Sequence, residues 1–123
     1  PHLKLSPQVM IERYSQGKIT IGGKLIRTDV IILPDGTVKH PWATKKRHLL
    51  TAQDVPGLLK EKMDVLIIGT GINGQMQTSM ALKQELKGMT YKVLYLETRS
   101  AIKRLQTLRE EGKKVGACFH IGC

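Results

Sequence analysis

The chain has 123 residues, of which 41% are hydrophobic and 24% are charged, and this composition excludes a disordered chain. Its formal net charge is +10 at pH 7, which favours an acidic protein partner or a small anion. Aromatic residues make up only 4%, too few for a single-strand nucleic-acid binding protein that stacks bases on aromatic rings. We therefore expect one domain over residues 1–123 and no nucleic-acid partner.

The cysteines and the hydropathy of the chain bear on its compartment. The two cysteines, Cys118 and Cys123, do not form the pattern of a disulfide framework, and they fit a reducing compartment. No apolar run approaches the roughly 20 residues that span a bilayer, and residues 1–7 lack the apolar core of a signal peptide. We expect a soluble, cytoplasmic protein, although removal of an upstream leader stays open. Residues 1–10, with two prolines, are expected to form a loosely held lead-in.

The first third of the chain predicts an antiparallel β meander. Short alternating segments are separated by turn residues, among them Gly22-Gly23 and Pro34-Asp35-Gly36. The expected strands cover residues 11–14, 18–21, 24–33 and 37–40.

A basic connector follows, over residues 41–48, and it holds the only Trp together with Lys45, Lys46 and Arg47. Thr51 and Asp54 have the spacing of a capping box, with Asp in the usual Glu position. Pro56 is suited to the first turn of a short helix, which we expect over residues 56–62, with Leu58 and Leu59 facing inward.

The second half of the chain predicts a βαβαβ unit. Val65–Ile68 is a run of branched apolar residues, typical of a strand buried on both faces. Two further buried strands are expected over residues 91–96 and 115–119. Helices are expected over residues 79–87, with Met80, Leu82 and Leu86 inward, and from residue 98 or 100 to 111. Right-handed crossovers then give a locally parallel sheet.

The first candidate site is the glycine pattern Gly69-x-Gly71-x-x-Gly74, directly after the strand 65–68. In a dinucleotide-binding fold such a turn binds a phosphate at a helix N-terminus, and Glu97 stands near the position of the ribose-binding acid. Against this interpretation, a meander of some sixty residues precedes the motif, and residues 75–78 separate it from the next helix. The alternative is that the glycines serve a tight exit from the strand.

The second candidate is Cys118-x-His120-x-x-Cys123, whose three ligand types suit zinc. No fourth ligand is near in the sequence, and His40 or His48 would have to approach from far away. A cysteine within a strand is also commonly a small buried hydrophobe. His120 and Cys123 could instead form a base and a nucleophile, but no third orienting group can be named. We expect no metal and no cofactor, and we assign no catalytic residue.

Landmarks spread along the chain resemble a known family. These are Tyr14, the hairpin 17–23, Asp29-Val30-Ile31-Ile32, Pro34-Asp35-Gly36, Trp42, His48-Leu49, the stretch 65–71, Gly74, Thr98, Ala101, Gly112, Phe119-His120 and Cys123. Together they are similar to the small domain-of-unknown-function family that includes the adipogenesis-associated protein and a mitochondrial respiratory complex I assembly factor. The connector departs from the family pattern, since Ala43-Thr44 and Arg47 stand where members often have Arg and Gly.

The resemblance implies an α/β fold: a three-layer β/β/α single domain without established catalytic activity. The mitochondrial relative acts as an assembly factor through protein contacts. We therefore expect a non-catalytic binding or assembly-type protein with an anion-favouring cleft between the glycine turn and the connector. The candidate ligand-binding residues are Gly69, Thr70, Gly71, Gly74, Trp42, Arg47, His48 and His120. The alternative is an enzyme that binds a small molecule or a nucleotide at the turn 69–74.

Overall fold

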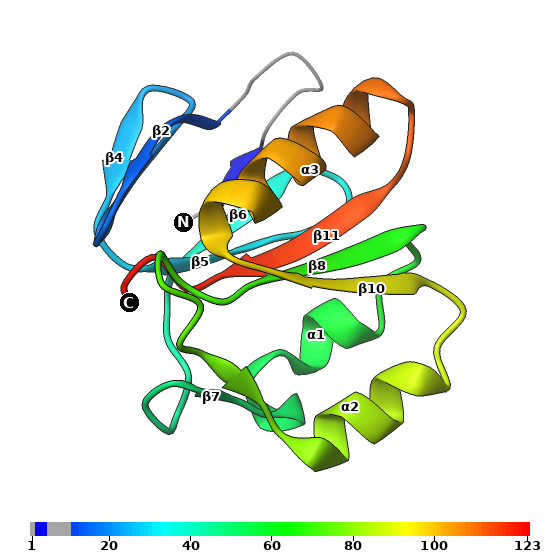
Figure 1. Cartoon of the computed structure of the whole chain (residues 1–123). Coiled ribbons are helices and arrows are strands. Elements are labelled where there is room, and N and C mark those ends of the chain that lie inside the picture. The colour runs from blue at the N-terminus through cyan, green and yellow to red at the C-terminus, as the bar shows by residue number, and fades with distance from the viewer. Residues whose placement is uncertain (1, 5–10) are drawn as a thin grey trace.

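The computed structural model describes residues 2–4 and 11–123, and a six-stranded mixed sheet forms its centre (Figure 1). The strands, in spatial order, are β1 (His2–Lys4), β6 (Thr37–Trp42), β5 (Asp29–Ile32), β11 (Val115–Phe119), β8 (Val65–Gly69) and β10 (Lys92–Leu96). Strand β8 pairs in parallel with both β10 and β11, whereas β11, β5, β6 and β1 pair antiparallel. The predicted meander followed by a βαβαβ unit is confirmed.

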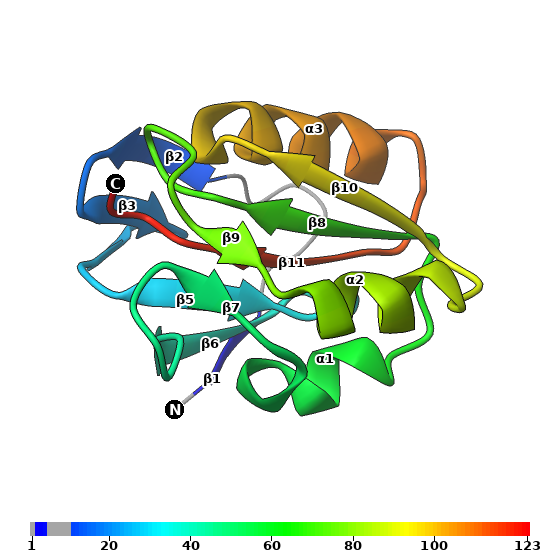
Figure 2. The ribbon, with the colours of Figure 1, turned by 60° about the horizontal axis from the view of Figure 1, so that its bottom comes forward.

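Two further layers cover the two faces of this sheet. One face carries helix α3 (Thr98–Glu110) and a small antiparallel sheet of β2 (Ile11–Ser15), β3 (Lys18–Ile21) and β4 (Lys24–Ile26). The opposite face carries η1 (Ala52–Asp54), α1 (Pro56–Leu59) and α2 (Met80–Lys87), and the short parallel pair β7 (Leu49–Leu50) and β9 (Gln77–Thr78) lies beside them (Figure 2).

The central strands separate two hydrophobic cores. Along β8, Val65 and Ile67 pack with α3 and the small sheet, while Leu66 and Ile68 pack with α1 and α2. This alternation follows from the period of two in a strand. Every residue of β8 and of β11 is buried, as the unbroken apolar run in the sequence predicts.

Several local predictions are also confirmed. Thr51 and Asp54 form the capping box of η1, and Pro56 begins α1. Ser79 caps α2 by accepting a hydrogen bond from the Leu82 N–H at 3.1 Å. These contacts depend on residues at most three positions apart, so the local sequence is enough to predict them.

The single strand predicted over residues 24–33 is wrong. The chain instead forms β4 and β5, separated by Arg27 and Thr28, and the two strands belong to different sheets. Alternation shows which residues of a strand share a face, but it does not show which sheet the strand joins.

Two burial predictions are wrong on the side of α2 and β10. Strand β10 is the edge of the central sheet, so its residues are only partly buried, and Tyr95 is 41% exposed. Met80, predicted to face inward, is 72% exposed at the start of α2, where Leu82 and Leu86 take the inward positions. Helix α1 also ends earlier than predicted, at Leu59.

The loosely held lead-in predicted over residues 1–10 lies largely outside the described residues. Residues 2–4 are described, and they form β1, which pairs antiparallel with β6 from His2 opposite Lys39 to Lys4 opposite Thr37. This strand is only three residues long, so it has no periodic pattern from which it could be predicted.

Candidate functional site

The turn that leaves β8 uses its own N–H groups for internal hydrogen bonds. We call residues 69–76 the glycine turn. Its N–H groups are engaged as follows: Thr70 with Leu96 O, Gly71 with Thr98 Oγ1, Ile72 with Gly122 O, Asn73 and Gln75 with Cys123 O, Gly74 with Gly71 O, and Met76 with Thr70 O, at 2.8–3.3 Å. These N–H groups are therefore not exposed and free to bind a phosphate or another anion, contrary to the hypothesis of an anion site at the turn. A ligand at these groups would have to displace bonds that hold the fold.

Close packing accounts for the first two glycines of the motif, Gly69 and Gly71. Gly71 has φ +112°, and a Cβ there would lie 2.4 Å from the carbonyl carbon of Cys123. A Cβ on Gly69 would lie 2.7 Å from Cδ1 of Phe119. The first two glycines thus let the end of β11 and the following residues approach the turn. This agrees with the interpretation of the motif as a tight strand exit.

Helix α2 begins too many residues after this turn for its N-terminus to bind the same ligand as the turn. Strand β9 (Gln77–Thr78) lies between the glycine turn and the cap of α2 at Ser79. The N-terminus of α2 is therefore separated from Gly74, and the geometry of a phosphate-binding strand–turn–helix is not formed.

The glycine turn and the connector lie side by side because β7 and β9 join them. The Gln77 N–H donates to the His48 carbonyl at 2.8 Å, and the Ser79 N–H donates to the Leu50 carbonyl at 2.9 Å. The sequence predicted this proximity but not the two short strands that produce it. A two-residue strand has no recognisable hydrophobic period.

A buried carboxylate, Asp54, holds the basic connector in place. Its Oδ1 accepts from the Lys45 N–H and its Oδ2 from the Thr51 N–H, both at 2.8 Å. Its carbonyl accepts a hydrogen bond from Trp42 Nε1 at 2.9 Å. The indole of Trp42 is thereby packed against η1, which gives it a structural role.

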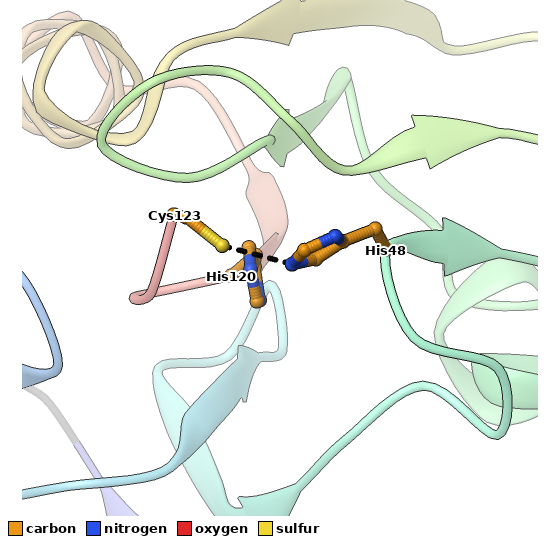
Figure 3. Close-up of side chains that lie close together, drawn as sticks. All are labelled: His48, His120 and Cys123. Carbon is orange, nitrogen blue, oxygen red and sulfur yellow. Dashed lines mark hydrogen bonds between the residues drawn. The ribbon is translucent and has the colours of Figure 1, made fainter.

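Three chemically active side chains meet where the connector passes the end of β11 (Figure 3). His48 Nε2 and Cys123 Sγ are 2.8 Å apart, and the rings of His48 and His120 meet edge to face with their centroids 5.5 Å apart. One ligand atom from each of the three residues lies within 4.8 Å of the other two. We call these residues the His–Cys cluster.

Asp29 fixes the orientation of His120. Its Oδ2 lies 2.9 Å from Nδ1 of the ring, and its Oδ1 accepts the Ile121 N–H at 2.9 Å. The hydrogen bond with Asp29 raises the pKa of His120, and the charges of Asp29 and Cys123 add to this, whereas burial of the ring acts against it. The contact between Asp29 and His120 spans 91 residues along the chain, so no local pattern in the sequence predicts it.

His48 takes an unusual backbone conformation, with φ 59°. Only a few per cent of non-glycine residues have positive φ, and such conformations cluster at functional sites. Here the conformation lets the main chain of His48 bond to β9 while its ring faces Cys123.

Comparison with known proteins places the fold in a family. Residues 11–120 match the family described as "Protein of unknown function (DUF498/DUF598)". The chain belongs to the DUF498/DUF598 family. Solved structures similar to it include the conserved hypothetical protein PH1505 from Pyrococcus horikoshii OT3, which is 29% identical with a TM-score of 0.81 and covers 92% of this chain and 98% of that one.

Two further solved structures share this arrangement of strands and helices. A protein named MT938 is 28% identical with a TM-score of 0.76, and the match covers 94% of this chain and 100% of that one. An outer membrane protein from Bartonella henselae is 21% identical with a TM-score of 0.78, over 94% and 96% of the two chains, and shares the fold. In this DUF498/DUF598 member, no helix among the described residues is long and apolar enough to cross a bilayer.

The candidate residues of this family member fall into separate places. His48 and His120 meet in the His–Cys cluster. Trp42 and His120 line a cavity of about 520 Å³ with Asp29, whereas Thr70 and Gly74 line a different cavity, of about 730 Å³. Gly69 and Gly71 pack against Phe119 and Cys123, and Arg47 is exposed on the connector.

The two cysteines of the DUF498/DUF598 member have different environments. Cys118 is 1% exposed and packs in the core beneath α1 and α2, and burial raises the pKa of its thiol. Cys123 is half-buried beside His48. The candidate trio of Cys118, His120 and Cys123 therefore does not come together, because β11 ends at Phe119 and the chain changes direction after it.

The 730 Å³ cavity of this family member lies between α2 and the edge strand β10. Alternate residues Tyr91, Val93 and Tyr95 line one wall, and Met76, Leu86 and Met89 add apolar surface. Lys83 and Lys87 of α2 supply its charge. Burial raises the pKa of both tyrosines, so their hydroxyls are neutral at pH 7. The cavity therefore combines an apolar wall with two lysine side chains.

Proposed function

We propose that this protein is a non-catalytic binding domain of the assembly type, and that it takes an acidic, extended segment of a partner protein between α2 and β10. The single observation that carries the proposal is the 730 Å³ cavity, which has an apolar wall and two lysines. In this proposal the 730 Å³ cavity is the binding site, in place of the cleft between the glycine turn and the connector. Of the earlier candidate residues, Thr70 and Gly74 line this cavity.

The edge strand beside the cavity supports a protein partner. β10 ends the central sheet, and no described strand pairs with its outer side. Extended segments bind such edges by adding a strand, with alternate side chains entering pockets. Tyr91, Val93 and Tyr95 lie two positions apart and line the cavity, so the main-chain edge and the side-chain pocket are adjacent.

Charge complementarity supports an acidic partner in particular. Lys83 and Lys87 line the cavity, Lys92 begins β10, and the whole chain has a formal net charge of +10. Such a field accelerates the approach of an acidic segment and discriminates against a basic one.

The residues that line the cavity support a binding role over a catalytic one. Those described include no His, Cys, Asp or Glu. Lys and Tyr can also serve in general acid–base and covalent catalysis, but no described His, Asp or Glu lines the cavity to exchange a proton with them. The enzyme that would bind a nucleotide at the turn 69–74 has less support, because the N–H groups of that turn are already bonded.

The family resemblance and the cysteines support the biological setting. The resemblance to the family that includes a mitochondrial respiratory complex I assembly factor favours a role in assembling other proteins. Cys118 and Cys123 are both free thiols, which fits a reducing compartment such as the cytoplasm.

A titration with a designed peptide tests the proposal. The probe is an extended peptide in which Glu alternates with Val or Phe, and amide shifts of the ¹⁵N-labelled protein are followed by NMR. We expect the shifts to concentrate on α2 and β10, and we expect the double variant Lys83→Glu, Lys87→Glu to bind at least about tenfold more weakly.

The matched control is Lys18→Glu, Lys24→Glu, which makes the same change in net charge on the small sheet. It should retain nearly the wild-type affinity. Equal losses in the two variants would show that only the net charge attracts the peptide. Shifts confined to the connector, or the same shifts with free glutamate, would also overturn the proposal.

A further inference from the structure

The His–Cys cluster is a second, separate place where the chain brings reactive groups together. His48 comes from the connector, and His120 and Cys123 come from the residues after β11 (Figure 3). Two imidazoles and a thiol are ligands that zinc prefers. None of the three lines the 730 Å³ cavity, so this site is independent of the proposed partner site.

The distances in the cluster are close to those of a metal site. Zinc–nitrogen distances of about 2.0–2.1 Å and zinc–sulfur distances of about 2.3 Å place tetrahedral ligand atoms roughly 3.4–3.6 Å apart. All three ligand atoms here lie within 4.8 Å of one another, and the pair His48 Nε2 and Cys123 Sγ is 2.8 Å apart. Side-chain rotations that move these atoms by about 1 Å are enough to reach the tetrahedral arrangement.

One ring nitrogen in the cluster lacks a hydrogen bond. Nε2 of His120 is buried and has no hydrogen-bond partner among the described residues. Buried polar atoms are nearly always satisfied, and an exception calls for an explanation such as an ion. Since Nδ1 of the same ring is held by Asp29, Nε2 is the nitrogen that remains to ligate a metal.

The surroundings of His120 match the usual support of a metal-bound histidine. Such a histidine commonly gives its other ring N–H to a carboxylate, which fixes the ring and makes it a stronger ligand. Asp29 has this position, and it is itself held by the Ile121 N–H. Asp29 and His120 are 12% and 16% exposed, so water competes little for their contact.

The charges of the cluster balance a divalent cation. A Cys123 thiolate and the Asp29 carboxylate contribute two negative charges, and neutral His48 and His120 contribute none. A bound Zn²⁺ therefore leaves the group formally neutral, which lowers the cost of burying it. The positive net charge of the chain acts against cations at long range, so the affinity has to come from direct ligation.

We propose that His48, His120 and Cys123 bind one Zn²⁺ ion, with His120 oriented by Asp29 and the fourth position open to water or a ligand. On binding, Sγ loses its proton to solvent as the zinc–sulfur bond forms, and both imidazoles coordinate as neutral rings. Any proton on Nε2 of His120 is released as well. Acid therefore weakens binding, because protons compete for the same atoms.

Calorimetric titration of the full chain with zinc salt, in several buffers, tests the site. We expect one zinc per chain, with release of at least one proton that the buffer dependence of the heat reports. Cobalt(II) should give a thiolate-to-metal charge-transfer band that disappears in Cys123→Ser. His48→Asn and His120→Asn should each weaken zinc binding by at least about tenfold, and Asp29→Asn by about 10–100-fold.

Two matched controls test whether a thiol or a histidine outside the cluster contributes to zinc binding. Cys118→Ala removes the buried thiol, and His40→Asn removes a histidine on β6 that is not a member of the cluster. Both should keep the stoichiometry and the affinity. If Asp29→Asn or His120→Asn fails to fold, His48→Asn on the connector still decides the question. Wild-type affinity in Cys123→Ser or His48→Asn would overturn the proposal, as would the absence of stoichiometric binding.

Discussion

The 730 Å³ cavity and the His–Cys cluster differ in what builds them. The cavity is a shape made by apolar side chains of α2 and β10, with lysines at its wall. The cluster is a meeting of titratable groups held by main-chain bonds and by Asp29. The glycine turn serves both, because Thr70 and Gly74 line the cavity while the N–H groups of Ile72 and Asn73 hold the residues that carry the cluster.

This difference means that the two sites depend on the fold to different degrees. An exposed wall residue of the cavity can change with little effect on stability, since it packs against few neighbours. A residue of the cluster or of its support takes part in contacts that join distant parts of the chain. We therefore expect mutations to separate the sites by their effect on stability.

The largest effect is expected for Gly71→Ala, which alters the turn shared by both sites. The substitution places a Cβ 2.4 Å from the Cys123 carbonyl carbon at φ +112°. We expect a loss of about 2–4 kcal/mol in the free energy of unfolding, from strain and overpacking together. Urea denaturation measures it. Gly17→Ala is the matched control, because Gly17 has φ +80° but open space around its Cα, and it should lose only about 1–2 kcal/mol. Equal losses would show that the contact with Cys123 adds nothing.

An intermediate effect is expected for Asp29→Asn, which alters the support of the cluster. Its charge-assisted hydrogen bonds to His120 and the Ile121 N–H are worth roughly 1–3 kcal/mol. The pKa of His120 is raised above its ordinary value, near 6.5, by this contact. The stabilisation is therefore fully present below the ordinary pKa and is lost as the pH rises through the raised pKa of the folded state.

Urea denaturation in a pH series tests this linkage. The wild type should lose stability as the pH rises above the ordinary histidine pKa, and Asp29→Asn should show a flatter profile over the same window. His40→Asn provides the control, because the pKa of His40 is shifted in the opposite direction, downward, mainly by burial. A profile for Asp29→Asn that parallels the wild type would contradict the assignment.

The smallest effect on stability is expected for Tyr95→Ala at the cavity. Tyr95 is 41% exposed, so its loss should change the free energy of unfolding by only about 0.5 kcal/mol. The affinity for the acidic peptide should nevertheless fall by roughly fivefold, because the ring is a contact surface. Leu25→Ala, with Leu25 49% exposed on the small sheet, should affect neither quantity. If Tyr95→Ala leaves peptide binding unchanged, the cavity is not the partner site.

Much of the fold could be predicted from local patterns. The apolar run Val65–Ile68 indicates a strand with two buried faces, and the spacing of Ala101, Ile102 and Leu105 indicates the inner side of α3. The sequence did not reveal the change of sheet at Arg27 and Thr28 or the edge position of β10. Both depend on which strands pair, and pairing is decided by contacts far apart in the chain.

The site was harder to predict for the same reason. His48, His120 and Cys123 were all candidates, but the contact between His48 and Cys123 spans 75 residues and was not predicted. Asp29 was not a candidate, and its contact with His120 spans 91 residues. The motif Cys118-x-His120-x-x-Cys123 contained two members of the cluster, His120 and Cys123, together with Cys118, which the fold buries in the core. Alternation along a strand predicts the side that a residue faces, and this rule fails once the strand has ended.

The residues after β11 have a consequence for the order in which the protein folds. Ile121 accepts hydrogen bonds from the Tyr14 hydroxyl and the Gly17 N–H, and the first of these closes a separation of 107 residues. Closing such a long loop costs chain entropy that only the assembled core can offset. We infer that the small sheet acquires its final attachment late in folding, after β11 has joined β5 and β8. The His–Cys cluster joins segments 75 residues apart, so we expect it too to form only after β11 has joined the sheet.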